Sequence, residues 1–137
     1  MALTLIWIGP QLKLFDLNTI ETIAKHVTKP DTFTIFVSAI LACWLMGLLS
    51  WLLSSATETV SRIIIIFIIT ATMSFTGLHH SIIGNVEVFS GMITSESIQF
   101  LDYIRFQSFA LLGNAIGGAF FVALLKYRAF VYNVDIN

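Results

Sequence analysis

Three long apolar runs with few charged side chains follow one another along the chain, with short polar links between them. The first, residues 32–57, contains no charge over 26 residues and so exceeds the ~20 residues needed to cross the hydrocarbon core of a bilayer. The others cover residues 63–92 and 106–126. We therefore predict membrane-spanning helices at 33–53, 63–92 and 106–126, in an all-α protein that crosses the cell membrane several times.

The N-terminal part contains shorter elements. Residues 1–12 are apolar but too short to span a bilayer, and Gly9-Pro10 interrupts them, so we expect a partial helix without the basic start of a signal peptide. Further on, apolar side chains recur at helical spacing: Ile20, Ile23, Ala24 and Val27. This spacing predicts a short amphipathic helix at the membrane interface, ended by Pro30.

A polar cluster interrupts the second apolar run, where residues 76–85 read Thr-Gly-Leu-His-His-Ser-Ile-Ile-Gly-Asn. A charged side chain at bilayer depth costs roughly 2.5–3.5 kcal/mol on insertion scales, so ionisable groups there usually mark a pathway or a proton relay. Gly77 and Gly84 bracket the cluster and allow the helix to open. We predict that the middle span is broken near 77–85 and carries an imidazole into a permeation path.

Small residues form a seam on each of the two outer spans. Ala39, Cys43, Gly47 and Ser50 fall on one face of the first, and Gly113 and Gly117 form a GxxxG pair on the third. In lipid such seams allow helices to approach closely. We expect these faces to make the contacts with a second polypeptide.

The composition supports a membrane setting, because 57% of the residues are hydrophobic and only 11% are charged, against about a quarter charged in soluble domains. A net charge of −1 provides no basic surface for nucleic acid, and the single cysteine, Cys43, forms no internal disulfide. No nucleophile–base pair, phosphate loop or metal set is present, so we expect neither an enzyme nor a bound cofactor. We divide the chain into an N-terminal segment (1–32), a transmembrane domain (33–128) and a short tail (129–137).

Three motifs, in the same order and at similar spacing, resemble those of the formate/nitrite transporter family. Residues 77–81, Gly-Leu-His-His-Ser, stand where the family has a Gly-Phe-Glu-His-Ser-type motif at its broken fifth span. Residues 42–46, Ala-Cys-Trp-Leu-Met, resemble the Cys-Asn-Trp-Leu-Val-type signature of the fourth span, and residues 113–118 match Gly-Asn-x-x-Gly-Gly of the sixth. The likeness covers residues 29–127 and implies one inverted repeat, spans four to six, of a six-span channel.

The resemblance implies a channel or transporter for small monovalent anions such as formate or nitrite, with His80 in the place of the central histidine. An anion that takes a proton from this imidazole would cross an apolar constriction as the neutral acid. The residues that we assign to this pathway are Lys29, Met73, Phe75, Leu78, His80, Ser81, Asn85 and Asn114. Each of three residues also has a structural interpretation. Asn114 is equally consistent with a hydrogen-bonded link between the third span and the broken helix. Ser81 could instead bond to the backbone of its own helix, and Lys29 could be a solvated residue that flanks the span.

The sequence departs from the family pattern at three positions. His79 replaces a glutamate, Cys43 replaces an asparagine, and Gly84 stands where the family has an asparagine, with Asn85 displaced by one residue. On a helix His79 lies about 100° round from His80, so we expect it to brace the loop and not to face the same cavity.

The resemblance also implies the partners: the lipid bilayer, a small anion, a proton, and further copies of the chain in a homo-oligomer, which is a pentamer in the family. Because the likeness covers spans four to six, we expect the pore to need either a first-half polypeptide or an antiparallel copy. Two other classes stay open from the residues: a truncated, non-transporting remnant, and a small membrane-anchor subunit whose histidines ligate haem.

Overall fold

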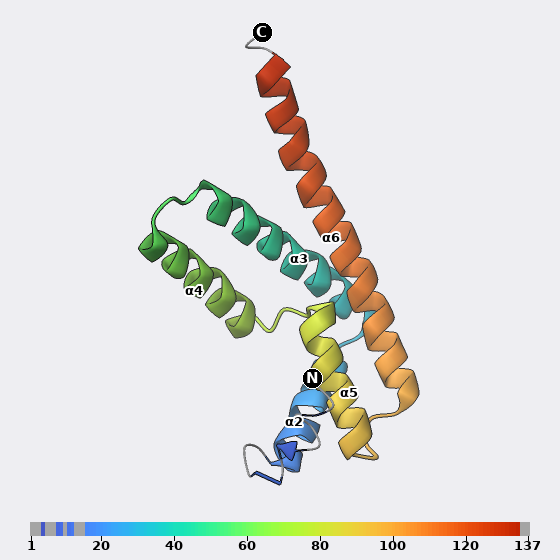
Figure 1. Cartoon of the computed structure of the whole chain (residues 1–137). Helices are drawn as coiled ribbons and strands as arrows, with labels where there is room; N and C mark the ends of the chain where they lie inside the picture. Colours follow the sequence, from blue (N-terminus) through green and yellow to red (C-terminus); the bar gives the residue numbers. More distant parts are fainter. Residues whose placement is uncertain (1–3, 5–7, 10, 13–15, 135–137) are drawn as a thin grey trace.

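The structure, a computed structural model, describes residues 4, 8–9, 11–12 and 16–134, and this part of the chain contains five helices and no strand (Figure 1). The helices are α2 (Leu17–Thr28), α3 (Thr32–Ser55), α4 (Thr59–Phe75), α5 (Ser81–Thr94) and α6 (Phe100–Val134). The prediction of an all-α chain is confirmed for the described residues. By length and composition α3 is long and apolar enough to cross a membrane, and α4 is a shorter apolar helix.

The expected amphipathic helix is α2, which ends at Thr28, two residues before Pro30. Its Ala24 is fully buried, and Val27 packs against the same core. Asp31 then starts α3, because its carboxylate accepts hydrogen bonds from the Thr34 hydroxyl at 2.6 Å and from the backbone N–H groups of Phe33 and Thr34. These bonds, led by that from the Thr34 side chain, lower the pKa of Asp31. The partial helix expected at 1–12 lies mostly outside the described residues.

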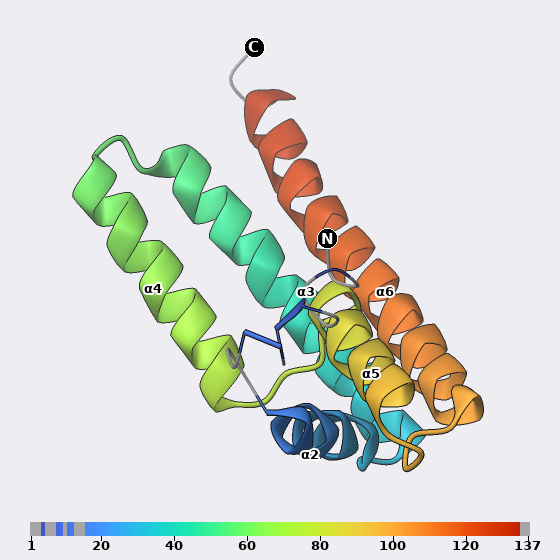
Figure 2. The same ribbon diagram turned by 60° about the horizontal axis from the view of Figure 1, so that its bottom comes forward.

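The two small-residue seams pack against each other, and α3 and α6 run side by side as a result (Figure 2). A side chain at Gly113 or Gly117 would collide with the backbone carbonyls of Phe36 and Ile40. One at Gly47 would collide with the ring of Phe121. The expectation that these faces contact a second polypeptide is therefore wrong, because the chain uses them to join its own first and last long helices.

The second apolar run is divided into two helices that have different neighbours. α4 ends at Phe75 and packs on α3, whereas α5 begins at Ser81 and packs on α2 and α6. Gly77 adopts a left-handed conformation, with φ of +62°, which favours glycine at the point where the helix stops. Gly84 does not belong to the interruption. It lies inside α5 and is buried against the ring of Phe106, which leaves no room for a Cβ at this position.

The last helix is longer than the predicted span of 106–126, since α6 extends from Phe100 to Val134 and includes most of the expected tail. Charged side chains near its start do not end it. Arg105 is half-buried, and its Nη2 donates a hydrogen bond of 2.6 Å to the carbonyl of Thr28 at the end of α2. The guanidinium of Arg105 thus lies at the C-terminus of α2, where a cation is stabilising. This contact allows α6 to carry a charged side chain within its first turns.

Buried side chains form two separate clusters. One joins α2, α3, α5 and α6: Ala24, Ile35, Ala39, Val88, Ile98, Phe106 and Ala110. The other joins α3 and α4: Ala42, Leu49, Ile69 and Met73. The interruption at residues 76–80 connects the helices of one cluster to those of the other, and this arrangement positions the site described next.

Candidate functional site

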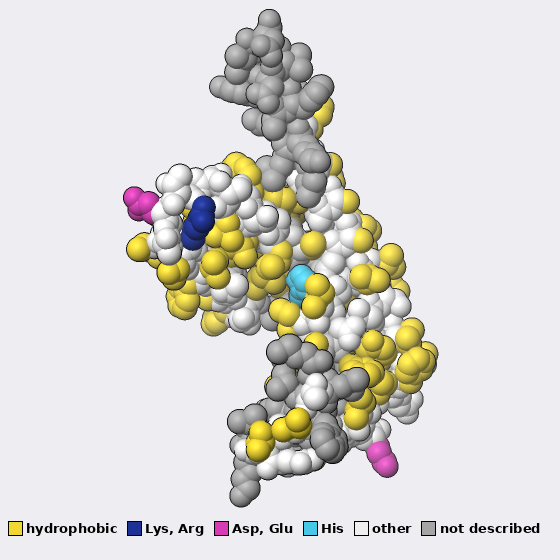
Figure 3. Space-filling view, viewed as in Figure 1, with side chains coloured by type: hydrophobic (Ala, Val, Ile, Leu, Met, Phe, Trp, Pro, Cys, Tyr) yellow, Lys and Arg dark blue, Asp and Glu magenta, His cyan; other side chains and the backbone are white. Residues whose placement is uncertain are grey.

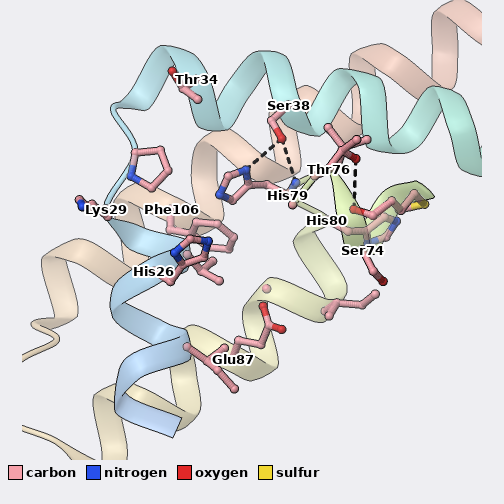
Figure 4. A pocket seen from close by; sticks show the side chains of 18 of the residues that line it. His26, Lys29, Thr34, Ser38, Ser74, Thr76, His79, His80, Glu87 and Phe106 are labelled. Atoms are coloured by element: carbon pink, nitrogen blue, oxygen red, sulfur yellow. Dashed lines mark hydrogen bonds between the residues drawn. The ribbon is translucent and has the colours of Figure 1, made fainter. Parts of the chain in front are cut away.

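A cavity of about 1220 Å³ lies at the helix interruption, between the two apolar clusters (Figure 4). Met73 and Leu78 border it from the α3–α4 side, and Val27 and Phe106 from the other. α2, α3 and α5 also contribute to its wall. An imidazole is visible from outside in the space-filling view, between the α3–α4 hairpin and the rest of the chain (Figure 3).

The titratable lining of the cavity comes from three parts of the chain. His26 and Lys29 come from the end of α2, His79 and His80 from the interruption, and Glu87 from α5. Figure 4 shows these side chains around one space, with the uncharged Ser38 and Thr34 of α3 above them. The fold therefore gathers three imidazoles, a carboxylate and a lysine at a site that only tertiary packing creates.

His79 holds the interruption against α3. Its backbone N–H donates to the Ser38 hydroxyl at 2.9 Å, and its ring Nδ1 lies 3.0 Å from the same oxygen. The ring centroid is 5.8 Å from that of Phe106 on α6. His79 nevertheless lines the same cavity as His80, contrary to the expectation above, because residues 78–80 are not helical and the rotation of 100° per residue does not apply.

His80 is the N-cap residue of α5. Its ring Nδ1 accepts a hydrogen bond of 3.3 Å from the backbone N–H of Ile82. A neutral imidazole has one donor and one acceptor nitrogen, so this bond assigns the ring proton to Nε2. The Nε2–H group is then the part of the ring that can donate to a ligand.

Asn114 joins three helices at the same level. Its side-chain oxygen accepts a hydrogen bond of 2.8 Å from the backbone N–H of Ser81, and its Nδ2 donates one of 2.7 Å to the carbonyl of Ala39. The residue is only 8% exposed. The bridge fixes the start of α5 against α6 and α3. This agrees with the alternative given above for Asn114, a link between the third span and the broken helix.

The structure brings together four of the eight residues assigned from the sequence. Lys29, Met73, Leu78 and His80 line the cavity. The other four do not: Ser81 and Asn114 are buried beside it, Asn85 is half-buried, and Phe75 is 94% exposed.

Three titratable residues of the lining were not among those assigned: His26, His79, which was expected to brace the loop, and Glu87. Glu87 had a signal in the sequence, since it lies seven residues after His80 and therefore two turns along the same helix face. His26 had none, because it belongs to a segment whose approach to α5 depends on tertiary packing.

An apolar, all-helical chain with a polar cavity at an interrupted helix has features that membrane transport proteins share. A profile of the formate/nitrite transporter family matches residues 1–128. The chain belongs to this family, whose members are transporters or channels and not enzymes, and the resemblance inferred from the three motifs is thereby confirmed. Comparisons with curated proteins and with solved structures gave no match.

Proposed function

We propose that this chain forms part of a passage for small monovalent anions such as formate or nitrite, in which His80 exchanges a proton with the anion. The observation that carries the proposal is the cavity at the helix interruption, which His80 lines between two apolar clusters. Membership of a transporter family supports the general activity.

The chemistry follows from the cost of placing an anion among apolar side chains. Transfer of an ion from water into such surroundings is unfavourable by many kcal/mol unless the charge is compensated or removed. The neutral ring of His80 offers Nε2–H to the anion as a hydrogen-bond donor. A second proton on the ring goes to Nδ1 and replaces the bond from Ile82, and the resulting imidazolium can give a proton to the anion. Lys29, which lines the same cavity, attracts the anion through its positive charge.

The test compares His80→Asn with His79→Asn and the parent chain in vesicles. His80→Asn retains hydrogen bonding but removes this titrating group, so formate uptake should lose the part of its dependence on pH between about 5 and 7, the range of an imidazole, that His80 supplies. His79→Asn keeps His80 and should retain that dependence, although loss of the ring contact with Ser38 should lower the amount of folded protein. An unchanged pH profile in the His80 variant would return this residue to a packing role.

We extend the proposal to the assembly. The cavity lies at the surface of the chain, and α4 leaves large side chains exposed, among them Ile63 at 60% and Phe67 at 70%. A closed path needs another wall, which an antiparallel copy, a homo-oligomer or a first-half polypeptide would supply. Formate uptake by a purified monomer of the 137-residue chain would contradict this requirement.

A further inference from the structure

Glu87 is the acidic side chain of the cavity, and the proposed passage does not yet use it. It lies on the face of α5 that also presents His80, Ile83 and Gly84 to the same space. Seven residues on a helix correspond to about 10 Å along its axis, so the carboxylate lies roughly that far from the level of His80. The side chain is half-buried.

Within the part of the chain that the structure describes, the Glu87 carboxylate makes no hydrogen bond and no ion pair. The ion pair found there joins two other residues, Lys25 and Glu21. The charged or titratable groups that face Glu87 across the cavity come from the end of α2 and from the interruption: His26, Lys29, His79 and His80. α3, α4 and α6 present uncharged side chains to the cavity, among them Ser38, Ser74 and Phe106. Glu87 is thus the source of negative charge within the described wall.

An anion that crosses the middle of this cavity comes near the carboxylate. A sphere of the cavity's volume is about 13 Å across, so an anion at its centre lies about 7 Å from the wall that contains Glu87, within one Debye length of ~8–10 Å. Partial burial reduces screening, and two like charges then repel each other more than they do in water.

We propose that Glu87 selects the charge that can enter the cavity: the ionised carboxylate opposes entry of an anion, and its protonation admits one. The inference rests on the proposed function, because it concerns how anions reach His80. The two residues have opposite effects on the anion, because His80 promotes its passage and Glu87 restricts it. Lys29 partly offsets the carboxylate, so the effect of Glu87 is a graded reduction of anion entry and not a complete block.

The experiment measures formate uptake at pH 7 and pH 5 into vesicles that contain the 137-residue chain. Glu87→Gln keeps the shape and removes the charge, and it should raise uptake at pH 7 by about 3- to 10-fold, with a smaller change at pH 5. Glu87→Asp keeps the charge and should behave as the parent. Glu58→Gln is the matched control, because it removes an exposed carboxylate in the α3–α4 link, away from the cavity.

Uptake at pH 7 that is equal to or lower than that of the parent, in a folded Glu87→Gln chain, would overturn the inference and leave the proposed function intact. A parent chain that carries no formate or nitrite, either as an assembled homo-oligomer or together with a first-half polypeptide, would overturn both. Glu87→Ala is measured as a second neutral variant, with circular dichroism and gel filtration in detergent to establish folding. If both neutral variants fail to fold and Glu87→Asp folds, the carboxylate is structural and the inference is wrong.

Discussion

Asn114 shows how one buried amide can hold the site without lining it. Two of its side-chain atoms are bonded to backbone groups on other helices, Ser81 on α5 and Ala39 on α3. The N–H of Ser81 is one of the first four of α5, which have no partner within their own helix. Since the amide satisfies this N–H, the position of the cavity wall depends on a residue outside the cavity.

We expect Asn114→Ala to lower the stability of the folded chain by about 1–3 kcal/mol, because it leaves a buried N–H without its partner. The control is Asn85→Ala, which removes a half-buried amide that bonds no other helix within the described residues. The measurement is denaturant unfolding in detergent micelles, followed by circular dichroism. Equal losses in the two variants would show that the bridge from Asn114 contributes nothing particular.

At this scale the sequence predicted the place of the interruption, because Gly77 precedes a histidine pair inside an apolar run. It could not predict the direction of the His79 side chain. That direction depends on the non-helical backbone of residues 78–80 and on Ser38, 41 positions earlier in the chain.

At the scale of helices, the contact between α3 and α6 depends on glycines of α6, which allow its backbone to lie directly against the backbone or a side chain of α3. Gly117 faces the carbonyl of Ile40, and the neighbouring Gly118 faces only the Sγ atom of Cys43, 3.1 Å from where a Cβ would lie. These two positions therefore differ in packing although they are adjacent in sequence and lie in the same helix.

Gly117→Ala should separate α3 from α6 and destabilise the chain by about 1–3 kcal/mol, as overpacking does in other cores. Gly118→Ala should be neutral or slightly stabilising, because the sulfur can shift and alanine favours a helix by about 1 kcal/mol over glycine. The same propensity gain applies to both changes, so the difference between their unfolding midpoints reports packing alone. Similar midpoints would contradict the close contact at Ile40.

The periodic and apolar signals of the sequence were sufficient to predict α2 and α3. The predicted span of 106–126 is shorter than α6, because the charged residues beside its bounds, Asp102, Arg105 and Lys126, lie within the helix and do not end it. The bond from Arg105 to Thr28 gives one of these charges a place within the helix, and no local pattern indicates that bond. Gly84 was assigned to the interruption for the same reason, since its contact with Phe106 is a tertiary one.

At the scale of the whole molecule, the links at the two ends of the α4–α5 pair lie far apart. The α3–α4 link contains Glu58, and the α5–α6 link contains Glu96, and Figure 1 shows the first at the upper left and the second at the lower right. α4 has 17 residues and α5 has 14, which correspond to about 25 and 21 Å. Each is shorter than the ~30 Å hydrocarbon core, so we expect the two helices to cross it together.

Cysteines placed at positions 58 and 96 should therefore react with an impermeant maleimide from opposite sides of the membrane. Both positions are exposed, and Cys43 is replaced by alanine beforehand so that the label reports the new thiols. Because Arg62, Lys126 and Arg128 fall on the side of Glu58, the positive-inside rule gives position 58 to the cytoplasm. Ile64→Cys, on the apolar face of α4, serves as the control that should remain unlabelled. Labelling of 58 and 96 from one side would mean that α4 crosses alone and α5 returns, which would place His80 and its cavity at a membrane surface and remove the physical basis for proton exchange at bilayer depth.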